Sequence, residues 1–485
     1  MSVPDLRLRA LNTVPLREEG AYVLYWMIAS RRATRSHALD RVGELSRRLG
    51  RPPLVLEALR AGYPFASDRL QRFVIEGMVD NAAAFARRGV LYYPYIEVRP
   101  GDGRGLLEAL AERSCAVVTD DFPAFFLPRM VAAAAARLPA RLEAVDGNGL
   151  LPMRAAPRVF HTAFSFRAFL QKELPAHLAE GPSADPWRRR ALPPPPRIPL
   201  EVRQRWPAAT GALLAAGRAL PHLAIDHAVP PAPLHGGSKS GRAVLGRFVA
   251  ERLLRYDEDR NHPDLDAASG LSPFLHFGHL SAHEVFDAIV ASEDWTIARL
   301  HPRGGRRHGY FGLSRGAEAF LDQLVTWREL GFNMCSKRDD HLTYGSLPPW
   351  ARETLSRHAS DRRTPLYERS ALEAAATHDR LWNAAQRQLL REGRIHGYLR
   401  MLWGKKILEW SASPEEALDT MIALNDRYAL DGRDPNSYSG ICWCLGRYDR
   451  PWGPERKVFG KVRYMSSENT ARKVRVKRYL EHYGV

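Results

Sequence analysis

The sequence predicts an α/β domain followed by an all-helical domain, and two observations predict this order. In the first 150 residues, short apolar runs alternate with amphipathic stretches, which is the pattern of a parallel sheet covered by helices on both faces. From residue 242 onward, apolar residues recur at the i, i+3, i+4 spacing of helices. The chain has 485 residues, 45% of them hydrophobic and 26% charged, which is enough material for several globular cores.

The elements of the first domain follow from this alternation. Buried strands are predicted at residues 21–27, 54–56, 90–93, 116–119 and 142–145, and amphipathic helices at 37–49, 69–88, 106–113 and 129–137. Together they predict a Rossmann-like parallel sheet, a fold that often binds a ligand beyond the carboxyl ends of its strands. The glycine-rich segment 101–105 lacks the spacing of a dinucleotide fingerprint, so we interpret it as a loop.

A proline-rich region separates the two domains. Prolines cluster at residues 193–196 and 230–233, which is typical of a linker. The segment Gly237-Ser-Lys-Ser240 is rejected as a phosphate loop, because serine precedes the lysine and no strand leads into it. The predicted organisation is therefore an α/β domain, a linker and an all-helical domain, with bounds 1–175, 176–240 and 241–485.

The second domain is predicted to consist of helices joined by breaks at proline and glycine. Apolar residues at helical spacing predict helices at 282–290, 317–330, 372–377, 382–392, 396–410 and 414–424.

Charge and cysteine content narrow the function classes. Lys and Arg number 71 against 54 Asp and Glu, a net charge of +17, which favours a polyanionic partner such as nucleic acid; surplus arginine of compositional origin is the alternative. Four cysteines exclude a disulfide scaffold, and the isolated Cys442/Cys444 pair cannot assemble a zinc or iron–sulfur site, so no metal is expected. No apolar run approaches the ~20 residues of a membrane span and no signal core opens the chain, so we expect a cytoplasmic protein.

Four segments of the helical half carry unusual residue combinations, each with a plain structural alternative. Residues 269–278 could offer donors to phosphate or form an ordinary helix cap. In residues 322–329 a tryptophan precedes an arginine. The two could form an aromatic platform next to a cation, or the tryptophan could be buried while the arginine extends its charge to the surface. Trp403 and Trp410 lie seven residues apart, on one helical face, which also suits core packing. Asp431, Asp434 and Asn436 lie in a predicted loop, where they could bind a polar ligand or satisfy the loop's own backbone.

Together these segments resemble the photolyase/cryptochrome flavoproteins and, within them, the class II cyclobutane pyrimidine dimer photolyases. The resemblance rests on these stretches: Leu381-Trp-Asn-Ala-Ala-Gln386, His396-Gly-Tyr-Leu-Arg-Met401, Lys405-Lys-Ile-Leu-Glu-Trp410, Asp431-Gly-Arg-Asp-Pro-Asn436 and Phe459-Gly-Lys-Val-Arg-Tyr-Met465. It covers most of the helical half and continues more loosely through the first domain. Residues 190–240 and the insertion at 301–315 lie outside it.

The resemblance implies an FAD-binding role for the all-α domain. The residues it assigns to FAD are Tyr256, Leu271, Ser272, Arg328, Arg400, Asp431 and Asp434, with Asn425 facing flavin N5. Those assigned to an electron relay are Trp382, Trp403 and Trp410. Those assigned to the DNA lesion are Gln323, Trp327, Met401 and Trp443. The chain departs from the family at Gln323, where the family usually has glutamate, and at Ser437, where it usually has glycine.

The basic C-terminal segment fits a DNA partner. Residues 450–478 hold ten Lys or Arg against two acidic residues, and those expected to contact DNA are Arg450, Lys457, Lys461 and Arg463. For residues 472–478 a solvated helix end explains the charge equally well.

The function expected from the resemblance is light-driven repair of cyclobutane pyrimidine dimers by a deoxyribodipyrimidine photo-lyase, a monomer that acts on UV-damaged DNA. Photoexcited reduced FAD would donate an electron to the dimer, and an antenna chromophore, 8-hydroxy-5-deazaflavin in preference to folate, is implied in the first domain. The alternative is a cryptochrome-like blue-light receptor with weak or no repair, which Gln323 favours. A flavin-free nucleic-acid-binding protein would require the flavin motifs to be coincidental.

Overall fold

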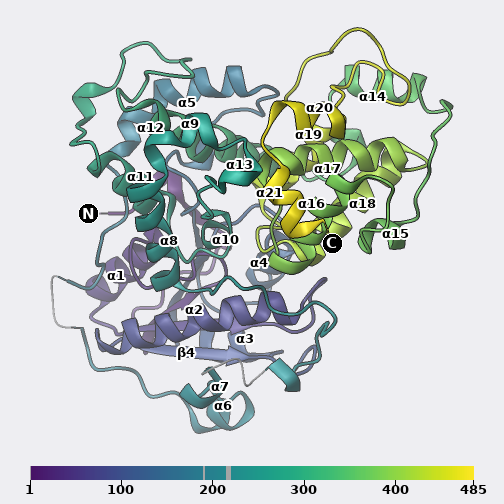
Figure 1. Ribbon diagram of the computed structural model, residues 1–485. Helices are drawn as coiled ribbons and strands as arrows, with labels where there is room; N and C mark the ends of the chain where they lie inside the picture. Colours follow the sequence, from purple (N-terminus) through teal and green to yellow (C-terminus); the bar gives the residue numbers. More distant parts are fainter. Residues whose placement is uncertain (1, 189–191, 215–219, 485) are drawn as a thin grey trace. The chain divides into compact units, whose positions relative to one another are not determined.

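The computed structural model describes residues 2–188, 192–214 and 220–484, and it divides the chain into two compact units (Figure 1). The first unit comprises Met1–Pro157, Glu173–Gly246 and Leu271–Ala288. The second comprises Arg158–Lys172, Arg247–Gly270 and Ile289–Val485. Each unit is thus assembled from three separate stretches of chain, whereas the domains predicted from the sequence are continuous.

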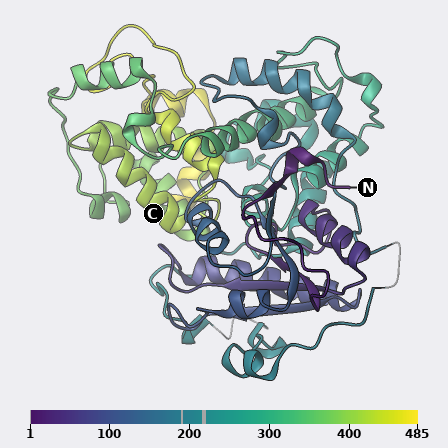
Figure 2. The ribbon, with the colours of Figure 1, turned by 180° about the vertical axis from the view of Figure 1, so that it is seen from behind.

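A six-stranded sheet forms the centre of the first unit, in the order β1-β6-β5-β2-β3-β4 (Figures 1 and 2). Its strands are β1 (Leu8–Ala10), β2 (Tyr22–Trp26), β3 (Pro53–Leu59), β4 (Leu91–Ile96), β5 (Ser114–Asp120) and β6 (Leu142–Val145). Strands β2 to β6 pair in parallel, as predicted, but β1 pairs antiparallel with β6 and makes the sheet mixed. The five predicted strands are confirmed, and β1 was not predicted.

Helices cover both faces of this sheet. They are α1 (His37–Leu49), α2 (Asp68–Ala86), α3 (Leu106–Ala111) and α4 (Leu127–Ala135), which confirm the four predicted helices. One face, with Val23 and Tyr25, packs against side chains of α1 and α2 in a core that is closed to solvent. On the opposite face, the Tyr22 hydroxyl donates a hydrogen bond to the Leu110 carbonyl of α3. This alternation follows from the two-residue period of a strand.

Between α5 (Ala163–Leu178) and α8 (Ser238–Glu251), the described part of the predicted linker contains only short helices. They are α6 (Leu200–Arg205), α7 (Gly211–Leu214) and the 3-10 helix Leu220–His222. The linker is nevertheless fastened to the first unit. The Trp206 indole donates to the Asp102 carbonyl at 2.9 Å, and the Tyr93 hydroxyl donates to the Trp206 carbonyl at 2.6 Å. Residues 189–191 and 215–219 of the predicted linker lie outside the described residues.

The rest of the chain is helical, as predicted. Its helices are α9 (Tyr256–Asp259), α10 (Ser272–His276), α11 (Ala282–Ala291), α12 (Arg315–Leu321), α13 (Arg328–Lys337), α14 (Pro349–Arg357), α15 (Arg369–Glu373), α16 (Arg380–Glu392), α17 (Gly397–Trp410), α18 (Pro414–Tyr428), α19 (Pro435–Cys444), α20 (Ser467–Lys473) and α21 (Lys477–Tyr483).

The structure corrects two of the predicted helices. The helix predicted at 372–377 ends at Glu373, because Ala375 takes a positive φ of 53° that no helix accommodates. The helix predicted at 317–330 is not a regular α-helix, since a π-helical segment, Asp322–Trp327, separates α12 from α13.

Helix α17 lies in the interior of the second unit, packed against α16, α18 and α19. Gly404 permits its close approach to α19, because a Cβ at this position would lie 2.5 Å from Cys444 Sγ. Within the described ranges, no helix has both the length and the apolar content needed to cross a membrane. The same residues contain no cluster of three or more His, Cys, Asp or Glu suited to a metal ion.

Candidate functional site

Three buried tryptophans form a chain through the interior of the second unit. Trp382 comes from α16, and Trp403 and Trp410 come from α17; each is at most 2% exposed. The rings of Trp382 and Trp410 meet edge to face, with centroids 5.5 Å apart. The Trp382 indole donates to the Trp403 carbonyl at 3.0 Å, and the Trp403 indole donates to Gln386 Oε1 at 2.8 Å. The structure therefore brings the three predicted tryptophans together, with Trp382 linking the two on α17.

Two further aromatic rings continue from Trp410 toward solvent. Tyr367 and His378 lie 5.4 and 5.3 Å from the Trp410 ring, measured between centroids. The Tyr367 hydroxyl is 2.8 Å from His378 Nδ1, and His378 is exposed. Sequence reasoning missed both residues, because they lie outside the quoted motifs and no local spacing links them to Trp410.

The predicted polar cluster contains a mostly buried ion pair. Arg400 of α17 donates to both carboxylate oxygens of Asp431, at 2.8 and 3.3 Å. The remaining donor, Arg400 Nε, is buried and has no hydrogen-bond partner among the residues that the structure describes. A buried donor without a partner is costly, which makes it a candidate contact for a polar ligand.

The predicted loop around Asp434 is in part a helix. Asp434 is the N-cap of α19, and its side chain accepts from the Asn436 backbone N–H at 2.9 Å. Asn436 lies in the first turn of α19, so its prediction as a loop residue was wrong. Asp434 thus accepts a hydrogen bond from the backbone of its own segment, which the sequence analysis gave as the alternative to ligand binding.

Asn425, in α18, belongs to a network that is closed to solvent. Its Nδ2 donates to Asp426 Oδ1 at 3.1 Å and to Ser437 Oγ at 3.0 Å, and Ser437 Oγ donates to Asn425 Oδ1 at 3.2 Å. Asp426 also accepts from the Tyr438 hydroxyl and the Arg433 backbone N–H. Burial raises the pKa of Asp426, and the nearby Arg433 opposes that rise. The network therefore fixes the Asn425 amide in one orientation.

The remaining predicted FAD residues fall in both units. Tyr256 and Arg328 belong to the second unit and are buried: Tyr256 packs on Phe248 and Phe320, and Arg328 lies 4.5 Å from the Phe332 ring. Burial raises the pKa of Tyr256.

Leu271 and Ser272 belong to the first unit, where they begin α10. Leu271 is the N-cap of this five-residue helix, and its apolar side chain has no atom that could accept a capping hydrogen bond.

Two of the predicted lesion residues share one face of the π-helical segment. In residues 322–327 only Gln323 and Trp327 are partly exposed, while the other four are buried. The Arg328 backbone N–H bonds to the Gln323 carbonyl, five residues back, which is the hydrogen bond of a π-helix. Because about 4.4 residues make a π-helical turn, side chains four apart project to the same side, and π-helical turns are frequent at functional sites.

A buried ion pair anchors the start of this segment. Arg167 of α5 donates from Nε and from its terminal nitrogen to the two oxygens of Asp322, at 2.8 and 3.0 Å. Both side chains are less than 10% exposed. Such a two-pronged pair fixes a carboxylate in both position and orientation.

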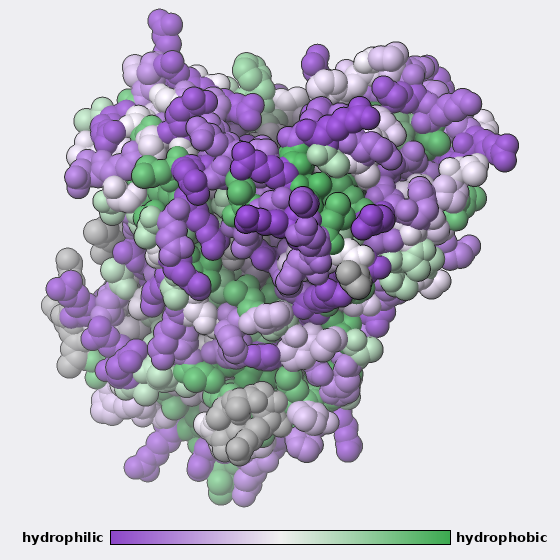
Figure 3. Space-filling view, in the orientation of Figure 1, coloured by the Kyte–Doolittle hydropathy of each residue, from purple (hydrophilic) through white to green (hydrophobic). Residues whose placement is uncertain are grey.

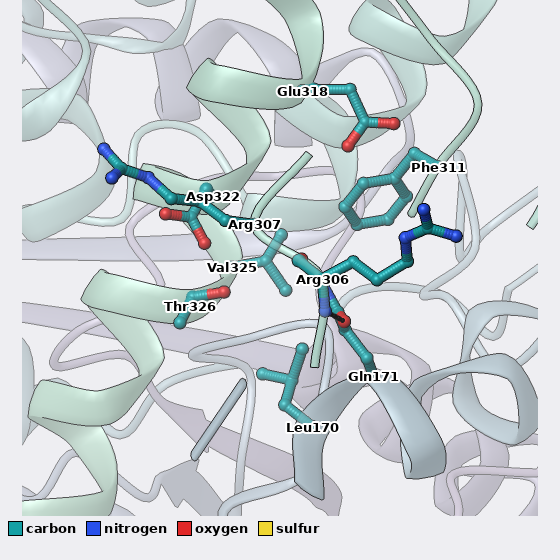
Figure 4. Close-up of a pocket in the computed structure, with 9 residues that line it drawn as sticks. All are labelled: Leu170, Gln171, Arg306, Arg307, Phe311, Glu318, Asp322, Val325 and Thr326. Atoms are coloured by element: carbon teal, nitrogen blue, oxygen red, sulfur yellow. Dashed lines mark hydrogen bonds between the residues drawn. The ribbon is translucent and has the colours of Figure 1, made fainter. Parts of the chain in front are cut away.

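A small cavity beside this pair is closed by the insertion at 301–315 (Figure 4). Gln171 holds the insertion by bonding both the N–H and the carbonyl of Arg306, at 2.8 and 2.7 Å. Glu318 accepts from the backbone N–H groups of Tyr310 and Leu313, and burial raises the pKa of Glu318. The cavity holds about 10 Å³, room for no more than a water molecule. It is lined by Leu170, Gln171, Arg306, Arg307, Phe311, Glu318, Asp322, Val325 and Thr326.

Cations and indoles alternate along a series from α17 toward the surface. Lys405 Nζ lies 5.3 Å from the centre of the Trp443 ring, and the Arg463 guanidinium lies 5.7 Å from the same ring. Arg463 and Arg450 lie 4.8 and 4.6 Å from the Trp452 ring. Trp452 and Lys405 were not predicted as site residues, because their contacts join positions that are distant in sequence.

The other predicted DNA contacts are exposed side chains of the same basic stretch. Lys457 and Lys461 are both exposed, and Lys461 Nζ is 3.7 Å from Glu455. In the region of α14 and α20, the face of the second unit seen in Figure 3 is largely hydrophilic. Met401, the last predicted lesion residue, lies on α17, and its carbonyl is 3.9 Å from Cys444 Sγ.

Comparison with known proteins shows which family the chain belongs to. No protein-family model matches the chain. A deoxyribodipyrimidine photo-lyase from Methanothermobacter thermautotrophicus is 33% identical over 476 residues, which cover 98% of this chain and 97% of that protein. The chain belongs to the photolyase/cryptochrome family. The family resemblance and the enzyme class predicted from the sequence are therefore confirmed, while membership of class II stays a prediction.

Solved structures of the photolyase/cryptochrome family share the fold. A class III photolyase from Agrobacterium tumefaciens has a TM-score of 0.65 at 17% identity and covers 96% of this chain and 86% of its own. A cryptochrome from Synechocystis has a TM-score of 0.68 at 14% identity, with 95% and 88% covered. The predicted fold class, an α/β domain with an all-helical domain, is confirmed.

Proposed function

We propose that this photolyase-family protein is an FAD-dependent enzyme of class II that uses light to split cyclobutane pyrimidine dimers in DNA. The observation that carries the proposal is the buried chain of Trp382, Trp403 and Trp410 in the same helical unit as the Arg400–Asp431 pair. The deoxyribodipyrimidine photo-lyase that matches nearly the whole chain supports the same activity.

The donor set around Arg400 fits a flavin. The free Arg400 Nε can donate to a polar ring edge, and Asn425 offers a fixed amide in the same unit. Bound FAD, when reduced, absorbs light and supplies one electron. Arg400, Asp431 and Asn425 would hold its ring system, with Asp434 at the polar edge. The phosphates and the ribityl chain would lie along Tyr256 and Arg328 of the same unit.

The tryptophans would return the flavin to its reduced form. Their indoles oxidise comparatively easily, and the 5.5 Å contact between Trp382 and Trp410 suits a short electron transfer. Burial keeps water away from all three rings.

The lesion would be held by flat and polarizable groups. Trp327, Met401 and Trp443 can sandwich bases that have left the stack, while the Gln323 amide can donate hydrogen bonds but cannot supply a proton. Phosphate contacts would come from Arg450, Lys457, Lys461 and Arg463, which are side chains that position DNA without reading its sequence. The protein would act as a monomer on UV-damaged DNA.

An antenna chromophore would absorb light for the flavin. We assign it to the first unit and favour 8-hydroxy-5-deazaflavin over folate. A cavity of about 440 Å³ in this unit is lined in part by Thr34, Arg87, Arg88, Asp185 and Trp187. Arg88 pairs with Asp185, so Trp187 offers a flat ring and Arg87 a cation to a planar anionic ligand.

A cryptochrome-like receptor is the second candidate, and Gln323 is the observation that favours it. Without the family's usual carboxylate at this position, the pocket holds the dimer with a neutral amide. The flavin and the tryptophans would then serve light detection with little repair.

One experiment separates the two candidates. The FAD-loaded protein is reduced and illuminated with an oligonucleotide that carries a single thymine dimer, and the ultraviolet absorbance of intact thymine is followed against a dark control. We expect the absorbance to return in the light only. No return with reduced flavin bound would exclude the repair enzyme and favour the receptor.

A further inference from the structure

Lys405 carries a buried charge that the proposed reaction does not use. The residue is 0% exposed, and its ammonium donates to the Cys444 carbonyl at 2.7 Å. No carboxylate forms an ion pair with it among the residues that the structure describes. A cation removed from water without a counter-charge is costly, so its position calls for an explanation.

Helix packing explains how this ammonium reaches its place. Gly404 brings α17 against Cys444, the last residue of α19, and Lys405 follows directly in the chain. The Cys444 carbonyl is one of the carbonyls that a helix leaves free at its carboxyl end, where a cation is favoured. Stabilisation of this helix end is therefore one role of Lys405, but it does not account for the aromatic ring beside it.

That ring is Trp443, which has two cations near it. Lys405 Nζ is 5.3 Å from its centre and belongs to the buried core, while the Arg463 guanidinium is 5.7 Å away and exposed. An ammonium held near an indole attracts the ring, and the attraction is stronger where water is excluded. The neighbouring Lys406 differs, because it pairs with Glu409 at 2.8 Å and lies near Trp410 instead.

We propose that Lys405 is a positioning residue of the lesion site: its buried ammonium holds the Trp443 indole in place, so that dimer binding depends on its protonation. This inference rests on the proposed function, in which Trp443 contacts the dimer. With the proton lost, the cation no longer attracts the ring, and Trp443 is free to leave the orientation that stacks on the lesion.

The pKa of Lys405 lies in a pH range in which DNA binding can be measured. Burial, aided by the positive charge of Arg463, lowers its pKa to about 8, while Cys444 and Asp449 oppose the shift. Burial raises the pKa of the Cys444 thiol to about 11, so this neighbour stays neutral over the same range. Lys405 is therefore charged below about pH 8 and neutral above it, and dimer binding should weaken as the pH rises through that value.

The test measures dimer preference against pH in the FAD-loaded protein, in the dark. Fluorescence anisotropy gives the Kd for a single strand with one thymine dimer and for its undamaged counterpart, from about pH 7 to about pH 9.5. Their ratio removes the effect of surface charges that contact phosphate. We expect the preference to fall about three- to thirtyfold in the wild type, which spans the strength of a cation–ring attraction from exposed to desolvated sites.

Three variants sharpen the result. Lys405→Met should lower the preference at pH 7 and make its pH profile flat, and Lys405→Arg, which stays charged, should keep the preference at high pH. Lys406→Met is the matched control and should keep the wild-type profile. If Lys405→Met fails to fold, the wild-type and Lys405→Arg profiles decide the matter.

The possible results distinguish the role of Lys405 from the proposed repair function. A wild-type preference that stays constant from pH 7 to pH 9.5 would overturn the role of Lys405 and leave the proposed function standing. No preference for the dimer at any pH would overturn the proposed function, and this inference with it. A pH-dependent near-ultraviolet circular dichroism signal that is centred near pH 8, and is lost in both Lys405→Met and Trp443→Phe, supports the inference without any DNA.

Discussion

The ion pair between Arg167 and Asp322 offers a sharp test of how the π-helical segment is held. Asp322→Asn keeps the size of the side chain but removes its charge, and it leaves the Arg167 guanidinium buried without a counter-ion. Breaking one side of a buried pair costs about 3–5 kcal/mol. Both partners are less than 10% exposed and joined by two hydrogen bonds, so we expect a loss within that range.

Urea unfolding followed by circular dichroism measures this loss. The matched control is Asp340→Asn, which breaks the pair between Arg338 and Asp340 at the surface, with the two side chains 31% and 45% exposed. That variant should cost less than about 1 kcal/mol. The double variant Arg167→Met, Asp322→Leu removes both charges and should recover most of the loss. A cost below about 1 kcal/mol for Asp322→Asn would show that the Arg167–Asp322 pair does not hold the π-helical segment.

Four further predictions follow from the site. Trp382→Phe should slow light-driven reduction of bound flavin at least tenfold without weakening dimer binding in the dark; an unchanged rate by absorbance spectroscopy would remove Trp382 from the relay. Gln323→Glu should raise repair turnover if the missing carboxylate limits it, and equal turnover contradicts that view. Gly404→Ala should destabilise the protein to urea by about 1–3 kcal/mol, since its Cβ would meet Cys444 Sγ at 2.5 Å. Arg463→Gln should weaken DNA binding and reduce the salt slope of log K by about one, and an unchanged slope would exclude a phosphate contact.

The elements that could be predicted are those with strong local signals. Helix α1 was predicted at its observed bounds, because Ser36 caps its start and Gly50, with a φ of 64°, ends it. Strand β1 was missed, since a strand of three residues is too short to show an alternating pattern. The π-helical turn was also missed, because one extra residue in a turn leaves the apolar pattern of a helix nearly unchanged.

Residue types at the site could be predicted, but their contacts could not. Trp382 and Trp410 come from different helices, and only packing sets the distance between their rings. Packing also decides the burial of Lys405, which depends on the closeness of α17 and α19. In the sequence nothing distinguishes Lys405 from the neighbouring Lys406. Trp452 joins the cationic series only through the folded path of the basic segment.

Light-dependent dimer splitting is the most direct test of the repair activity proposed for this protein. The reduced, FAD-loaded protein and an oligonucleotide with one thymine dimer are mixed in the dark, illuminated, and followed by the absorbance of restored thymine. We expect restoration that requires light and is lost when Trp443→Ala removes the stacking ring. Flavin that binds, becomes reduced and absorbs light while the dimer stays intact would exclude the proposed activity.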